Sequence, residues 1–95
     1  MIFLNNNIII TRMQQKDKKA LGILGNRIRK LRKETKSSLD GFISLNGGTT
    51  SASLSRVENG LVDVKFTTLL KISAALKIPL SEMLKDLEFD YSLED

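Results

Sequence analysis

The sequence contains no cysteine, no histidine and no tryptophan among its 95 residues. Without cysteine no disulfide can form, which is compatible with a cytoplasmic location. Cysteine and histidine are also the usual zinc ligands, so we expect neither a metal site nor a cofactor. The sequence further lacks a glycine-rich phosphate loop and any carboxylate cluster with metal-ligand spacing, and we therefore expect no enzymatic activity.

Long apolar segments are missing as well. No apolar run reaches the roughly 18 residues that a transmembrane helix needs, so we expect no membrane span. Residues 1–10 are partly apolar, but Asn5, Asn6 and Asn7 interrupt them and no basic residue precedes them. This pattern does not suit a signal peptide, and the expected location is the cytoplasm.

Charge is distributed unevenly along the chain. The net charge is +4, but residues 1–36 carry ten Lys and Arg against two acids, a balance of +8, whereas residues 37–95 have a balance of −4. A basic N-terminal region beside an acidic remainder favours a polyanion bound on one side of the molecule. The alternative is a solvated helix face.

The chain is long enough for one small domain, and its apolar spacing predicts an all-α fold. Five helices are expected, over about residues 24–36, 38–45, 51–59, 65–76 and 79–87. We divide the chain into an N-terminal arm (1–20), a helical domain (21–87) and an acidic tail (88–95). For the arm we favour mobility, with a strand that pairs with a partner subunit and a translated leader ahead of Met13 as alternatives.

Particular residues are expected to cap the helices and fill the core. Thr50 is the expected N-cap of the third helix, Ser37 or Ser38 that of the second, and Asp63 that of the fourth. The side chains expected to form the apolar faces are Leu24, Ile28, Leu31, Phe42, Ile43, Leu54, Val57, Phe66, Leu69, Leu70, Ile72 or Ser73, Leu80, Met83, Leu84 and Leu87.

The most informative segment is residues 48–60. Leu54 and Val57 share one face of its predicted helix, and Gly60 follows as the residue that adopts a positive φ without strain. The opposite face carries Ser51, Ala52, Ser55, Arg56 and Asn59. A glycine turn at Gly47 and Gly48 separates this helix from the one before it, an arrangement that places a second helix in the DNA major groove.

Residues 48–60 (GTTSASLSRVENG) resemble the core of Cro/lambda-repressor-like (Xre-type) helix-turn-helix proteins. Residues 25–34 look like the first helix of that family, and residues 68–76 and 78–84 like its fourth and fifth, so the resemblance covers roughly residues 22–87. It implies a five-helix lambda-repressor-like domain. It also implies a transcriptional regulator, such as a repressor, that binds double-stranded DNA as a homodimer on a near-palindromic operator.

The resemblance assigns roles to individual residues. Base contacts are expected from Thr50, Ser51, Ala52, Ser55 and Arg56, with Arg56 able to form a bidentate pair with guanine. Phosphate contacts are expected from Lys36, Ser37, Ser38, Asn59 and Lys65. Arg32 and Glu58 match an ion pair that joins the first helix to the end of the third. The alternatives are a phosphate contact or surface ion pair for Arg56, and two separate surface charges for Arg32 and Glu58.

Several residues depart from the family pattern. Ser51 and Ala52 are short where long polar side chains are common, Leu39 replaces a phosphate-binding glutamine, and Lys77 replaces a helix-ending glycine. The turn between the second and third helices is also one residue longer than usual. These departures favour a specificity that depends on DNA shape as well as on base contacts.

The C-terminal end is more apolar than a chain terminus needs, and Met83, Leu84, Leu87 and Phe89 are the expected dimer interface. Two alternative functions stay open. One is a protein-interaction module, such as the antitoxin of a toxin–antitoxin pair, which would have a protein partner. The other is a restriction–modification controller protein.

Overall fold

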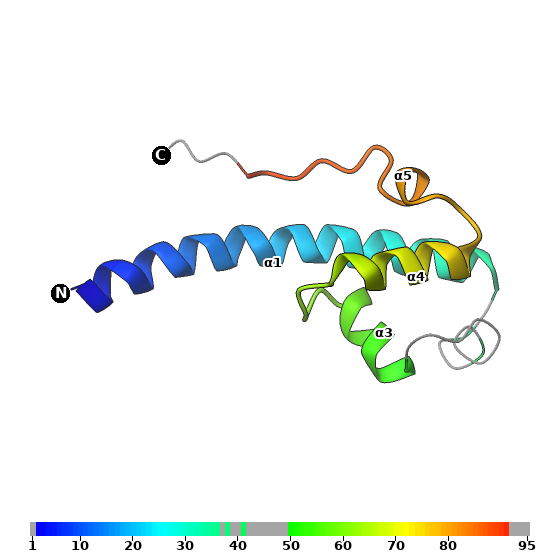
Figure 1. The fold of residues 1–95 in the computed structure, drawn as a ribbon, viewed down its shortest axis with the longest axis horizontal. Helices are drawn as coiled ribbons and strands as arrows, with labels where there is room; N and C mark the ends of the chain where they lie inside the picture. Colours follow the sequence, from blue (N-terminus) through cyan, green and yellow to red (C-terminus); the bar gives the residue numbers. More distant parts are fainter. Residues whose placement is uncertain (1, 37, 39–40, 42–49, 92–95) are drawn as a thin grey trace.

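The structure, a computed structural model, describes residues 2–36, 38, 41 and 50–91. Those residues form four helices and no strand: α1 (Ile2–Glu34), α3 (Ser51–Glu58), α4 (Phe66–Leu76) and α5 (Leu80–Met83) (Figure 1). The expected all-α class is confirmed. Four helices are described where five were expected, because the helix expected over residues 38–45 lies outside the described residues except for Ser38 and Gly41.

Helix α1 is much longer than the sequence analysis expected. Its 33 residues correspond to about 50 Å of helix, which accounts for the longest dimension of the molecule, 51 Å. The expected start at Leu24 is wrong, since the chain is already helical from Ile2. No proline or glycine precedes Gly22, and asparagine or isoleucine lowers helix propensity only modestly. The division at residue 20 and the mobility of the arm stay predictions.

Helix α1 is long, but charged residues recur along it from position 12 onward. Among the described residues, no helix is both long enough and apolar enough to cross a lipid bilayer.

Helix α3 begins and ends as predicted to within one residue. The Thr50 hydroxyl accepts a hydrogen bond from the Ser53 backbone N–H at 3.1 Å, the expected N-cap contact. At the other end Asn59 is the C-cap and Gly60 follows with φ +68°, the left-handed conformation that glycine adopts most readily. The ends of this helix are therefore set by local sequence.

Helices α4 and α5 differ from the prediction at their ends. Lys65, not Asp63, is the N-cap of α4, and no side chain caps that end. Lys77 ends α4 in the left-handed conformation at φ +60°, at the position where the family commonly has glycine. Helix α5 stops at Met83 instead of continuing to about residue 87, and Asp86 in the following turn also has a positive φ of 64°.

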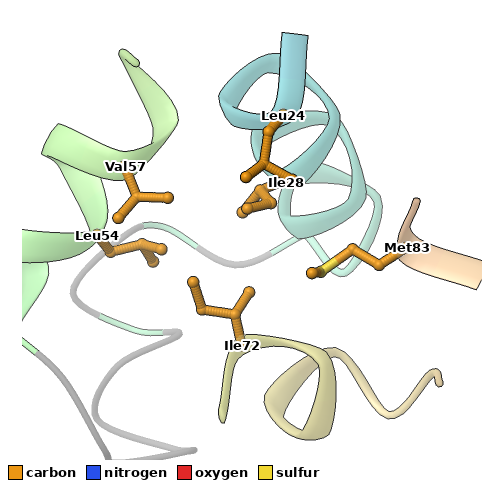
Figure 2. Close-up of a cluster of buried hydrophobic side chains, with 6 residues drawn as sticks. All are labelled: Leu24, Ile28, Leu54, Val57, Ile72 and Met83. Atoms are coloured by element: carbon orange, nitrogen blue, oxygen red, sulfur yellow. The ribbon is translucent and has the colours of Figure 1, made fainter. Parts of the chain in front are cut away.

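The core lies where all four helices meet. Its buried apolar side chains are Leu24, Ile28, Leu54, Val57, Ile72 and Met83 (Figure 2). Phe66 and Leu70 were expected inside but are 63% and 42% exposed. They lie four residues apart on a face of α4 that points away from Ile72, the α4 residue that enters the core. Helical spacing alone does not show which of two apolar faces becomes buried.

Met83 corrects the expected dimer surface. Its side chain is 0% exposed within the single chain and points toward Ile28 and Ile72 (Figure 2). It is therefore a core residue and cannot contact a second copy. Of the other residues in that set, Leu84 and Leu87 are half-buried and Phe89 is 42% exposed.

Contacts with α1 hold α5 and the C-terminal segment in place. Arg27 donates from Nε to the Met83 carbonyl and from a terminal nitrogen to the Glu82 carbonyl, both at 3.2 Å. The chain after α5 then runs back along α1 toward its N-terminal half, where the Tyr91 hydroxyl donates to the Asp17 carboxylate (Figure 1). Helix α1 thus holds both α5 and the C-terminal segment.

Candidate nucleic-acid interface

The end of α3 lies unusually close to α1, at two glycines. A Cβ added to Gly25 would lie 2.4 Å from the Val57 carbonyl oxygen and 2.5 Å from that of Glu58. A Cβ added to Gly60 would lie 2.9 Å from the Gly22 Cα. Real Cβ atoms do not approach other atoms this closely, so the crossing requires glycine at position 25. This crossing fixes the distance between α3 and α1.

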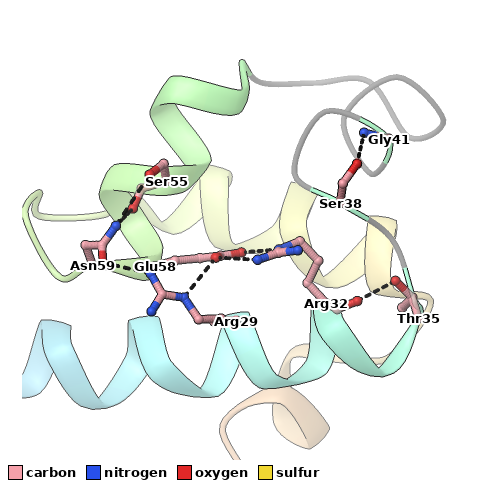
Figure 3. A network of polar contacts seen from close by, with 8 residues as sticks. All are labelled: Arg29, Arg32, Thr35, Ser38, Gly41, Ser55, Glu58 and Asn59. Atoms are coloured by element: carbon pink, nitrogen blue, oxygen red, sulfur yellow. Dashed lines mark hydrogen bonds and ion pairs between the residues drawn. The ribbon is translucent and has the colours of Figure 1, made fainter.

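A buried ion pair joins the same two helices. Arg32 Nε donates to Glu58 Oε2 at 2.6 Å, and a terminal nitrogen of Arg32 donates to Oε1 at 2.9 Å (Figure 3). Arg32 is 6% exposed and Glu58 is 1% exposed. The hydrogen bond to Glu58 raises the pKa of Arg32 above its ordinary value, an effect that burial opposes and the Glu58 charge reinforces. Because each charge would be costly alone at this depth, the pair holds the C-terminal turn of α3 against α1.

A second arginine of α1 extends this contact to the protein surface. Arg29 Nε donates to Glu58 Oε1 at 3.3 Å, and a terminal nitrogen of Arg29 donates to Asn59 Oδ1 at 2.7 Å. Asn59 Nδ2 in turn donates to the Ser55 carbonyl at 2.8 Å and lies 3.4 Å from Ser55 Oγ (Figure 3). A chain of polar contacts therefore connects α1 to the outward side of α3.

The five residues expected to contact bases lie along or just before α3. Thr50, Ala52 and Arg56 are exposed, while Ser51 and Ser55 are half-buried. The Thr50 hydroxyl is already engaged, since it donates to Ser53 Oγ at 2.9 Å besides capping the helix. Arg56 is thus the only long, exposed cation of the set.

The residues expected to contact phosphates differ in their exposure and in the hydrogen bonds they already make. Lys36 and Lys65 are exposed, and Lys36 has a positive φ of 62°. Ser38 is exposed and its Oγ accepts from the Gly41 backbone N–H at 3.0 Å, whereas Ser37 lies outside the described residues. The donors of Asn59 are used within the chain, because its backbone N–H bonds to the Ser55 carbonyl and its amide makes the contacts above. These bonds give Asn59 a structural role.

Two of the residues expected to contact DNA line the same depression, which has a volume of about 290 Å³. It lies between the end of α3 and the start of α4, with Arg56, Lys65 and Asp63 among its polar lining. The remaining lining residues are Ser53, Val57, Val62, Val64 and Thr68. In the described part of the chain, no group of three or more acidic side chains is placed to hold a metal ion.

The sequence analysis missed two residues that shape this surface, Gly25 and Arg29, and also missed the role of Arg27 in holding α5. A signal for Arg29 was present, since it precedes Arg32 by three residues and therefore lies on the same side of the first helix. The sequence held no comparable signal for Gly25, because a glycine required by a close backbone contact looks like any other glycine in a single sequence.

Comparisons with known proteins give one informative match. No family model matches the chain, and no curated protein matches it. The fold is similar to a crystal structure of an HTH_3 family transcriptional regulator from Vibrio cholerae, with a TM-score of 0.65 and 29% sequence identity. The match covers 72% of this chain but only 38% of that protein. It supports the resemblance to Cro/lambda-repressor-like helix-turn-helix proteins that was drawn from the sequence.

Proposed function

We propose that the chain is a transcriptional regulator that binds double-stranded DNA in a sequence-dependent manner. The observation that carries the proposal is how α3 is held against α1. Its inner face is fixed to α1 by Gly25 and by the Arg32–Glu58 pair, while Thr50, Ala52 and Arg56 remain exposed. A rigidly held helix with an exposed polar side is what major-groove recognition requires.

Charge supports the same proposal. The basic balance of residues 1–36 includes Lys33 and Lys36, exposed near the end of α1, and Lys65 is exposed at the start of α4. Such cations can contact backbone phosphates on either side of a helix that lies in the groove.

Binding to a randomised pool of duplexes, measured at several salt concentrations, tests this function. Contacts from Lys33, Lys36 and Lys65 in each subunit would neutralise about six phosphates per dimer and give a slope of log K against log[salt] of roughly −5. The selected duplexes should share a short preferred sequence. A slope near zero, or a selected pool without sequence preference, would contradict sequence-dependent DNA binding.

The proposal includes a homodimer on a near-palindromic operator. Because Met83 is buried, the surface offered to the second copy consists of Leu84, Leu87 and Phe89. Two-fold symmetry would then place two copies of α3 about 34 Å apart, one turn of DNA. Leu87→Glu should give monomers that keep their helical content and bind the operator more weakly. Sedimentation that shows a monomeric wild type at high concentration would contradict the dimer.

A protein-interaction module is the second candidate. Leu61, Phe66 and Leu70 are 72%, 63% and 42% exposed, and large exposed apolar side chains favour a protein partner. An antitoxin that neutralises a toxin would combine such a surface with DNA binding. A selected duplex pool without sequence preference would favour a function through a protein partner over sequence-dependent DNA binding.

A further inference from the structure

We propose that Arg29 is a positioning residue that acts through Asn59 to set the hydrogen-bonding character of Ser55 on the DNA-facing side of α3. The inference rests on the proposed function, and it adds a determinant of base preference that lies on α1. It follows from the contacts in Figure 3.

Hydrogen-bond chemistry fixes the orientation of the Asn59 amide. A guanidinium only donates hydrogen bonds, so the Asn59 atom that lies 2.7 Å from Arg29 must be Oδ1. A carbonyl only accepts, so the atom that lies 2.8 Å from the Ser55 carbonyl must be Nδ2. Both contacts therefore require the same orientation of the Asn59 amide, and the flipped orientation would break both.

This orientation has a consequence for Ser55. Asn59 Nδ2 also lies 3.4 Å from Ser55 Oγ, within reach of a weak hydrogen bond in which the serine oxygen is the acceptor. Within the part of the chain that the structure describes, the hydroxyl proton of Ser55 has no acceptor of its own, and it is left to donate outward. In the major groove, guanine O6 and N7, adenine N7 and thymine O4 accept such a bond, whereas the cytosine amino group does not.

Arg29 is suited to this role by its geometry and not only by its charge. Its side chain is 38% exposed, and its planar guanidinium spans Glu58 and Asn59 at the same time. A lysine ammonium at this position keeps the positive charge but is a compact point charge that lacks the fork. Glu58 retains its bidentate contact with Arg32 when Arg29 is changed, so the fold does not depend on this contact alone.

The experiment compares Arg29→Met, Arg29→Lys and Ser55→Ala, with Lys30→Met as the control for loss of an exposed α1 cation. The first measurement needs no DNA: nitrogen–proton NMR spectra of the Asn59 side-chain amide. We expect Arg29→Met and Arg29→Lys to shift the two amide protons toward the values of an exposed asparagine, and Lys30→Met to leave them unchanged.

The second measurement is the base preference on duplexes from the selected pool. We expect both Arg29 variants to lose roughly three- to tenfold discrimination at one base position, as Ser55→Ala does. The Arg29→Met/Ser55→Ala double variant should lose no more than Ser55→Ala alone, because both changes remove the same contact.

Three results would overturn the inference. They are an unchanged Asn59 amide spectrum in Arg29→Met, a wild-type base preference in Arg29→Lys, and Arg29 variants that lose the same affinity for every duplex. A wild type with no base preference defeats the proposed function and this inference together. A selective wild type whose Asn59 amide does not respond to Arg29→Met defeats only the inference.

Discussion

Gly25 of α1 lies against the Val57 carbonyl of α3 so closely that an added Cβ would approach the oxygen to 2.4 Å. Backbone meets backbone at this point, so no side-chain rotation can relieve the overlap. The distance between the two helices is therefore set by a missing side chain.

Gly25→Ala and Gly22→Ala should change stability in opposite directions. The Gly25 variant should lose about 1–3 kcal/mol or more in unfolding free energy, because α3 must move away from α1. A Cβ on Gly22 meets nothing within 4 Å, so Gly22→Ala should gain up to about 1 kcal/mol from helix propensity. Denaturant unfolding measures both. Equal effects of the two variants would show that the close crossing does not form in solution.

Arg32→Met should destabilise the fold by about 3 kcal/mol, since Glu58 would stay buried with only the 3.3 Å contact from Arg29. Replacing both Arg32 and Glu58 with apolar residues of similar volume should recover much of this loss. Arg32→Lys, which keeps the charge but not the two-point contact, should fall between. Thermal melts compare the four proteins, and an Arg32→Met melt identical to the wild type would mean that the pair is exposed.

Arg56→Ala should lower affinity for the preferred duplex by about 1–3 kcal/mol and relax the preference at one position, because Arg56 is the long exposed cation of α3. Lys36→Asn is the matched loss of charge, and asparagine suits the positive φ of that position. It should weaken all duplexes alike, since phosphate carries no sequence information. If the two variants weaken every duplex equally, α3 does not contact bases.

Tyr91 should titrate above its ordinary pKa of about 10. The hydrogen bond to Asp17 is the main cause of the raised pKa, and the negative charges of Asp17 and Asp63 add to it. The protonated phenol makes the contact, so its stabilising effect is present below the ordinary pKa and disappears as the pH rises through the raised value.

Ultraviolet absorbance of the phenolate reports this residue alone, because the chain has one tyrosine and no tryptophan. Asp17→Asn should lower the midpoint, and the unfolded protein should show the ordinary value. A wild-type midpoint equal to that of the unfolded protein would show that the C-terminal segment does not contact α1.

Local sequence was enough to predict the parts of the fold that depend on neighbours in the chain. Thr50 and Gly60 mark the ends of α3, and the three-residue spacing of Leu54 and Val57 identifies its buried face. The contact of Arg32 with Glu58 was available only through the family resemblance, because 26 residues separate the partners.

Features that depend on distant parts of the chain were missed. Phe66 and Met83 are both apolar residues at helical spacing, yet one is exposed and the other is fully buried. The choice depends on which face of α4 meets the core and on where α5 docks, and periodicity contains neither fact. The long N-terminal part of α1 was missed for a different reason: its asparagine and isoleucine residues are weak helix formers, yet no proline or glycine interrupts the helix before Gly22.

The two hydrogen bonds from Arg27 to the end of α5 also bear on how this part of the molecule opens. A helix of four residues cannot persist on its own, because too few backbone bonds offset the cost of nucleation. The backbone amides of α5 should therefore exchange with solvent whenever α5 detaches from α1, and not through independent fraying. In hydrogen-exchange terms, the protection of Leu80–Met83 depends on its contact with the part of α1 around Arg27, although more than 50 residues separate the two along the chain.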